Sequence, residues 1–175
     1  MGFNIGWIGV RSPERSEILD LLGVQDTYVH DEVNETPMSW AHLPTGWTIL
    51  FFNTPDERFE QAYTALAQTS DVIACVALET TMDCHVLSAC RGKALWSLLY
   101  QAEQKHLGVQ VGGTPPSCFQ LIQQSLGEAQ AVSDANGDDV DHLFEVPLQV
   151  AEQETGYAYG RSRFDWGEPR FTELR

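Results

Sequence analysis

A run of carboxylates between residues 134 and 141 is the first place to look for chemistry. Calcium loops of the EF-hand type need oxygen ligands at positions 1, 3 and 5 and a glycine at position 6. Asp134, Asn136 and Asp138 match the first three positions, but Asp139 stands where the glycine should be. The spacing therefore predicts an exposed acidic turn and no metal site.

Cysteine and histidine side chains offer a second kind of chemistry, because a thiol with a nearby base can act as a nucleophile. The chain has four cysteines and five histidines, but no two cysteines show the two-residue spacing of a zinc or redox motif. Cys84 and His85 are neighbours in an expected strand, so their side chains point to opposite faces and cannot pair. We therefore expect buried thiols in a reducing compartment, which indicates a cytoplasmic protein. The spacing of these side chains predicts no metal site, and we expect no cofactor.

The glycine-rich segment 108–113 does not fit a phosphate-binding loop. It lacks the strand–turn–helix spacing of a dinucleotide fingerprint, and the prolines at 115 and 116 would break a turn that cradles phosphate. An enzyme or a small-ligand module stays open as an alternative function. It would use residues 83–85 or the glycines at 112 and 113.

Net charge is the bulk property that says most about partners. The formal charge is −15 and is uneven: residues 1–156 hold six basic side chains against 22 acidic ones, whereas residues 157–175 hold four arginines against three acids. Such a negative field repels nucleic acids and anionic membranes and attracts a basic partner. No apolar run approaches the roughly 18 residues that a membrane-spanning helix needs. We predict neither nucleic-acid binding nor membrane insertion; the alternative is that the charge only keeps the protein in solution.

These charges favour a non-catalytic protein-binding domain over an enzyme, and most concretely an immunity protein that neutralises a basic toxin or effector. Complementary charge speeds encounter and discourages wrong partners. A secretion adaptor or chaperone is a further alternative, and the oligomeric state is left open. The predicted contacts are two acidic clusters and one tryptophan from a tail rich in arginine and aromatic residues: Asp31, Glu32, Glu35, Asp134, Asp138, Asp139, Asp141 and Trp166.

The elements that must hold these residues follow from periodicity and capping. Runs of β-branched and aromatic residues predict strands, and helix starts are marked by Ser12 with Pro13 and by Thr54 with Glu57. The expected strands cover residues 3–10, 38–43, 47–53, 71–79, 85–89, 94–99 and 108–111. The expected helices cover residues 12–23, 54–69, 117–130 and 146–156.

The order of these elements predicts the fold class. Strands occur in adjacent runs instead of alternating strictly with helices, which favours an α+β fold. We expect a single domain over residues 1–156, with a mostly antiparallel sheet and three to four helices packed largely on one side. Residues 157–175 form a tail rich in arginine and aromatic residues, which the sequence leaves either docked on this domain or free.

Three motifs carry a resemblance to known proteins. They are residues 6–10 (Gly-Trp-Ile-Gly-Val), residues 43–53 (Leu-Pro-Thr-Gly-Trp-Thr-Ile-Leu-Phe-Phe-Asn) and residues 140–147 (Val-Asp-His-Leu-Phe-Glu-Val-Pro). With these motifs the chain resembles, over most of its length, a family of small, uncharacterised bacterial cytosolic proteins. The resemblance implies a bacterial cytosolic origin and a single domain, and it carries no functional residues with it. In general character such small acidic domains are similar to immunity proteins.

Overall fold

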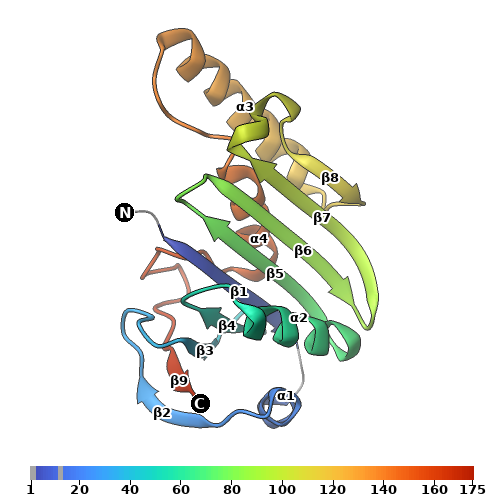
Figure 1. Cartoon of the computed structure of the whole chain (residues 1–175), viewed down its shortest axis with the longest axis vertical. Helices are drawn as coiled ribbons and strands as arrows, with labels where there is room; N and C mark the ends of the chain where they lie inside the picture. The colour runs from blue at the N-terminus through green and yellow to red at the C-terminus, as the bar shows by residue number, and fades with distance from the viewer. Residues whose placement is uncertain (1–2, 12–13) are drawn as a thin grey trace.

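The chain folds around one antiparallel sheet. A computed structural model describes residues 3–11 and 14–175, and within them it contains nine strands. Their bounds are β1 (Asn4–Arg11), β2 (Asp26–His30), β3 (Met38–His42), β4 (Thr48–Phe52), β5 (Asp71–Leu78), β6 (Asp83–Cys90), β7 (Lys93–Gln101), β8 (Gln110–Gly113) and β9 (Thr172–Leu174). They lie in the order β2-β9-β3-β4-β1-β5-β6-β7-β8, and every neighbouring pair is antiparallel (Figure 1). The predicted α+β class and mostly antiparallel sheet are confirmed.

Helices connect these strands at several points. In the described part of the chain they are α1 (Arg15–Leu22), α2 (Glu57–Thr69), the 3-10 segment η1 (Ala102–Leu107), α3 (Cys118–Asn136) and α4 (Glu145–Thr155). None of the described helices is both long and apolar enough to cross a bilayer.

The helix ends differ in part from those predicted. Gly23 ends α1 in the left-handed conformation, as expected for a C-cap. The N-cap of α2 is Asp56 and not Thr54, because the Asp56 carboxylate accepts a hydrogen bond from the Arg58 amide at 3.0 Å. Ser12 and Pro13, the predicted start of α1, lie outside the described residues.

Helix α3 continues well beyond its predicted end. It runs to Asn136, where Gly137 at φ 75° caps it, so Asp134 lies on the helix and not in an acidic turn. Its inner face carries the buried polar residues Gln130 and Ser133 in this stretch. The apolar pattern that predicts helices therefore stops before the helix does.

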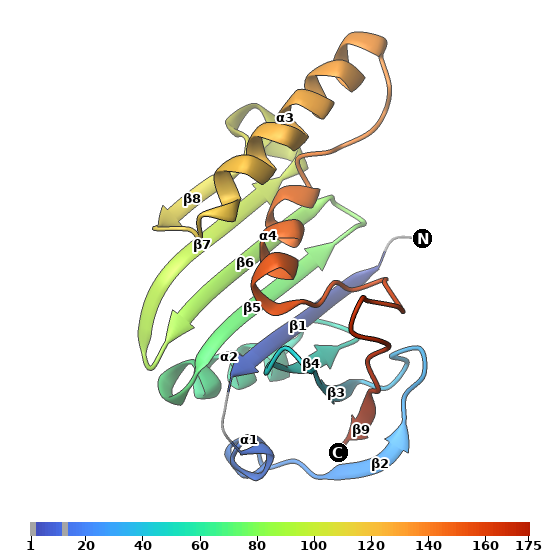
Figure 2. The ribbon, with the colours of Figure 1, turned by 180° about the vertical axis from the view of Figure 1, so that it is seen from behind.

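The helices cover both faces of the sheet, which corrects the expectation that they pack largely on one side. Alternate residues of β1 explain this arrangement, because successive side chains of a strand point to opposite faces. Ile8 and Val10 join the apolar core under α1 and α2, whereas Ile5 and Trp7 join the core under α4. Figure 1 shows α2 in front of the sheet, and Figure 2 shows α3 and α4 on the opposite face.

A glycine in β1 lets helix α2 approach closely. A Cβ added to Gly6 would lie 2.8 Å from the ring atom Cδ2 of Phe59, closer than real Cβ contacts come. Phe59 is buried and meets Phe52 edge to face at 5.4 Å. Gly6 therefore leaves the space that the buried ring of α2 occupies.

The C-terminal segment packs against the domain and completes its sheet. Strand β9 lies between β2 and β3 in the sheet, although it comes last in the chain. Just before it, Phe171 is 4% exposed and its ring meets those of Phe51 and Tyr157 at 6.1 and 5.9 Å. Residues far apart in the sequence thus share one apolar core.

We expect Phe171→Ala to destabilise the protein by about 3–5 kcal/mol, since it removes a buried ring and leaves a cavity. Urea denaturation followed by tryptophan fluorescence measures the loss. Arg170→Ala, at the exposed neighbouring position, is the control and should change stability by no more than about 0.5 kcal/mol. Equal stabilities of the two variants would contradict the packing of this segment.

Candidate functional site

The two predicted acidic clusters lie on different parts of the molecule. Residues 31–35 belong to the connection between β2 and β3. Asp134 lies near the end of α3, and residues 138, 139 and 141 lie in the connection 137–144 between α3 and α4. Figures 1 and 2 both show these connections well apart along the long axis. The structure therefore does not bring the predicted contacts together into one surface.

Asp31 builds its own loop. It is 6% exposed, and its carboxylate accepts hydrogen bonds from the Glu35 amide at 2.9 Å and from the Thr36 hydroxyl at 2.6 Å. Glu32 and Glu35 are exposed. Of this cluster, only these two side chains are placed where a partner can reach them.

The second cluster is partly engaged within the chain. Asp134 accepts hydrogen bonds from Gln130 at 2.8 Å and from the ammonium group of Lys105 at 3.1 Å, and both hold its pKa below the usual value. Asp141 accepts the hydroxyl of Tyr100 at 2.7 Å. Asp138 and Asp139 are exposed, which leaves their carboxylates open to a partner.

Trp166 closes the C-terminal segment onto the domain. Its indole N–H donates to the Gly156 carbonyl at 3.1 Å. Its ring stacks on Phe164 with centroids 4.7 Å apart and planes within 4° of each other. The side chain is half-buried, so the predicted contact residue serves first to hold this segment in place.

The residues of the alternative enzyme hypothesis are not arranged as a nucleophile and its base. Burial, followed by a hydrogen bond with Cys75, raises the pKa of the Cys84 thiol well above its ordinary value. Burial lowers the pKa of His85, and its side chain belongs to the other face of the sheet. Gly112 and Gly113 lie in strand β8. In the described part of the chain, no three His, Cys, Asp or Glu side chains converge in a way that could hold a metal ion.

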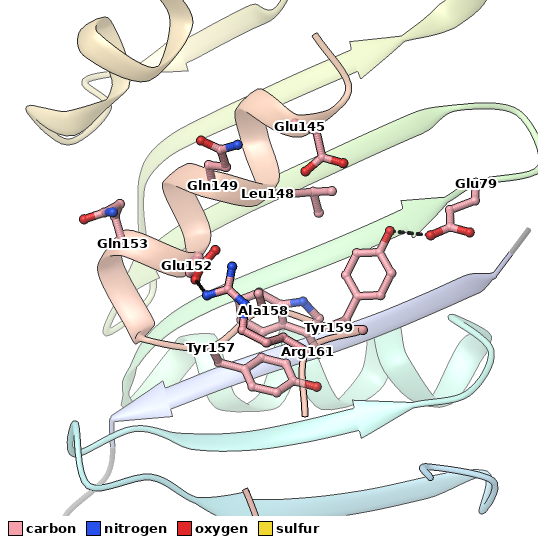
Figure 3. A pocket seen from close by; sticks show the side chains of 12 residues that line it. Glu79, Glu145, Leu148, Gln149, Glu152, Gln153, Tyr157, Ala158, Tyr159 and Arg161 are labelled. Carbon is pink, nitrogen blue, oxygen red and sulfur yellow. Dashed lines mark hydrogen bonds and ion pairs between the residues drawn. The ribbon is translucent and has the colours of Figure 1, made fainter. Parts of the chain in front are cut away.

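A cavity of about 610 Å³ lies beside α4. Its walls come from α4, from the segment that follows it, from the middle of β1 and from the end of β5 (Figure 3). This volume is in the range that accommodates small ligands or a protein side chain. The residues that line it are Trp7, Glu79, Glu145, Leu148, Gln149, Glu152, Gln153, Tyr157, Ala158, Tyr159, Gly160 and Arg161.

Helix α4 supplies a polar stripe to the cavity because its other face is used by the core. Val146, Val150 and Ala151 are completely buried against the sheet. The positions offset from them point toward the cavity at the i, i+3, i+4 spacing of one helical face. These residues are Glu145, Leu148, Gln149, Glu152 and Gln153.

The turn after α4 brings the opposite wall into place. Gly156 caps the helix at φ 77°, a left-handed conformation that reverses the chain direction. Tyr157 is buried and meets Trp7 edge to face, with centroids 5.4 Å apart. Tyr159 and Arg161 then line the cavity beside α4.

One end of the cavity holds two carboxylates (Figure 3). Glu79 accepts the Tyr159 hydroxyl at 2.8 Å and the Phe3 amide at 3.0 Å. Burial, and then this hydrogen bond, raise the pKa of Tyr159, so the hydroxyl stays a donor. The Glu145 carboxylate has no hydrogen-bond or ion-pair partner among the described residues.

Two neighbouring carboxylates oppose the ionisation of Glu145, although its side chain is exposed and lies in the first turn of α4, where a negative charge is favoured. Desolvation raises its pKa, and the negative charges of Glu79 and Glu152 raise it further, while His142 acts in the opposite direction. A nearby positive charge would relieve this strain on the ionised form.

The other end of the cavity already contains a cation. The Arg161 guanidinium forms an ion pair with Glu152 and lies over the Phe164 ring, 5.5 Å from its centroid. Three carboxylates thus face one guanidinium around the cavity, an excess of negative charge.

The cavity wall also includes a buried donor. Trp7 is 1% exposed, and its indole N–H has no hydrogen-bond acceptor among the described residues. A buried N–H without an acceptor costs free energy, which a ligand's acceptor could recover where the side chains that cover the N–H move aside.

None of these cavity residues was predicted from the sequence as a site residue, although Trp7 and Glu145 belong to the motifs at 6–10 and 140–147. A signal existed in the polar residues at 145, 149 and 152, which recur on one face of a helix whose other face is apolar. Glu79 and Trp7 carried no such signal, because only the fold places them beside α4. The resemblance to a bacterial family stays a prediction, since no family model, no curated protein and no solved structure matches the chain.

We expect Glu145→Gln to raise the free energy of unfolding at neutral pH by up to about 0.5 kcal/mol, because it removes a carboxylate that its neighbours disfavour. The raised pKa means that the ionised form costs stability as pH rises above the ordinary glutamate value. The gain should therefore vanish when pH falls below that value and Glu145 is protonated in the folded and unfolded chains alike. Urea denaturation across pH measures it. Glu154→Gln, on the same helix but outside the cavity, is the control, and an equal gain in both variants would contradict the assignment.

Tyr159→Phe should destabilise the protein by about 1–2 kcal/mol, because it removes a hydrogen bond to the charged Glu79 in a half-buried place. Thermal and urea unfolding give the difference. The matched control is Tyr28→Phe, since Tyr28 is 84% exposed. If both variants have the same free energy of unfolding, the hydrogen bond between Tyr159 and Glu79 does not stabilise this wall of the cavity.

Proposed function

We propose that the chain is a non-catalytic binding protein for a basic protein partner, in the manner of an immunity protein that neutralises a toxin. The observation that carries the proposal is the excess of carboxylates around a concave cavity, where Glu145 has no counter-ion in the described part of the chain. Binding a cation there relieves an unfavourable charge that the folded chain otherwise keeps. A protein with a net charge of −15 draws such a partner toward it from a distance.

Exposed carboxylates outside the cavity support the same function. Glu32, Glu35, Asp138 and Asp139 are all exposed on connections between elements. Rim charges of this kind mostly change the association rate and its salt dependence. They steer the partner, while the cavity provides the place where one of its groups is held.

A second candidate is a small-ligand module, and the cavity itself favours it. Its volume lies in the range of small-molecule sites, and carboxylates, carboxamides and aromatic rings converge on it. In this second candidate the cavity binds a free small molecule, whereas in the first it binds a side chain of a partner protein.

Affinity capture from a lysate of the source cells, at low and at moderate salt, tests the proposal. We expect one basic protein to be retained in stoichiometric amount and to be toxic when expressed without this chain. Replacing Glu32, Glu35, Asp138 and Asp139 by their amides should slow association about tenfold at low salt, measured by surface plasmon resonance. The proposal fails if no protein is retained, or if co-expression does not protect cells from the retained one.

A further inference from the structure

The cavity beside α4 contains an internal example of how it accepts a cation. At one end the Arg161 guanidinium pairs with the Glu152 carboxylate and lies over the Phe164 ring. Guanidinium groups suit such places, because they are planar, weakly hydrated and stack on aromatic faces while they donate to carboxylates. This end is saturated by the chain's own arginine.

At the opposite end the Glu145 carboxylate has no cationic partner among residues 3–11 and 14–175. Figure 3 shows the Glu145 carboxylate on the same side of the cavity as the Tyr159 ring, with Leu148 between α4 and the ring. The charge of Glu145 contributes to raising the pKa of Tyr159, which places the two groups within electrostatic reach. A carboxylate of α4 thus lies toward each end of the cavity, and Glu152 has a guanidinium beside it.

A second, independent observation specifies what else the ligand carries. The buried indole N–H of Trp7, in the wall of the same cavity, has no acceptor among the described residues. A guanidinium only donates hydrogen bonds, so it cannot serve this group. An arginine residue within a polypeptide provides both functions, since its side chain donates and its backbone carbonyl accepts.

We infer that this cavity binds an arginine residue of the partner protein, with the guanidinium paired to Glu145 and a peptide carbonyl available to the indole N–H of Trp7. This inference rests on the proposed function for the identity of the partner, but the recognition itself can be measured without one. Arginine is also the basic residue that is enriched at the energetic centres of protein interfaces.

The probe is Nα-acetyl-arginine N-methylamide, which carries a guanidinium and two peptide carbonyls. It is titrated into the isotope-labelled full chain, and the indole N–H signals of the five tryptophans are followed by NMR. We expect saturable binding that shifts the Trp7 signal, identified by its loss in Trp7→Phe. The citrulline analogue has the same shape and no charge, and it should bind about tenfold more weakly or not at all.

Variants of one helix decide the role of the carboxylate. Glu145→Gln should weaken binding of the arginine probe about tenfold or more, because it removes a charge-assisted pair. Glu154→Gln makes the same change of charge on α4 outside the cavity and should bind as the unmodified chain does. Agmatine carries a guanidinium and an amine but no peptide carbonyls. It therefore tests whether the carbonyls contribute to binding, and it should bind more weakly than the probe.

Three results would overturn the inference: no saturable binding of the arginine probe, equal binding by the citrulline analogue, or equal binding by Glu145→Gln. Tighter binding of agmatine would assign the cavity to a free cation instead. If the probe fails while a basic partner is still captured, the proposed function stands and only the arginine assignment falls. If the probe binds and no partner is captured, the arginine assignment stands and the proposed function falls.

Discussion

Strand β1 lies at the centre of the sheet with both faces covered, and this double burial sets the positions of the helices. Six consecutive residues from Ile5 to Val10 are buried. Strands buried on both faces have continuous apolar sequences. The side chains of such a strand need an apolar layer on each side of the sheet. Helix α2 provides one layer, and α4 with the C-terminal segment provides the other.

The cavity is a consequence of how the second layer is built. Helix α4 and the segment after it are two separate pieces laid across the sheet, and each buries only its apolar side. Their polar sides face each other across the cavity, with Glu145 and Glu152 on one piece and Arg161 on the other. The hydrophobic effect thus fixes the walls, and electrostatics within those walls determines what can bind.

The distribution of charge along these walls carries a cost in stability that the fold tolerates. Glu152 has a cationic partner, Arg161, whereas Glu145 has none among the described residues. A residue kept in an unfavourable electrostatic state is typical of binding sites, where the free energy is recovered when a ligand arrives. The buried Trp7 indole N–H in the same wall is a second feature of this kind.

Local patterns in the sequence predicted local structure well. The strand runs rest on preferences of neighbouring residues, so they could be predicted without the fold. The end of α3 could not, because its inner face at Gln130 and Ser133 is polar and is satisfied by residues of the following loop. Asp31 shows the same limit: its sequence context predicts a surface acid, while its hydrogen bonds place it inside a loop.

The sequence by itself determined the class of fold and the strongly acidic charge, since these are sums over residues or over short segments. The tertiary structure decided which carboxylates share a site. Glu79, Glu145 and Arg161 come from three separate parts of the chain, and their mutual distances follow from the packing of α4 and the C-terminal segment on one face of the sheet. Electrostatic effects depend on distance and burial, so the free carboxylate of Glu145 and the buried donor of Trp7 exist only once the layers have been assembled.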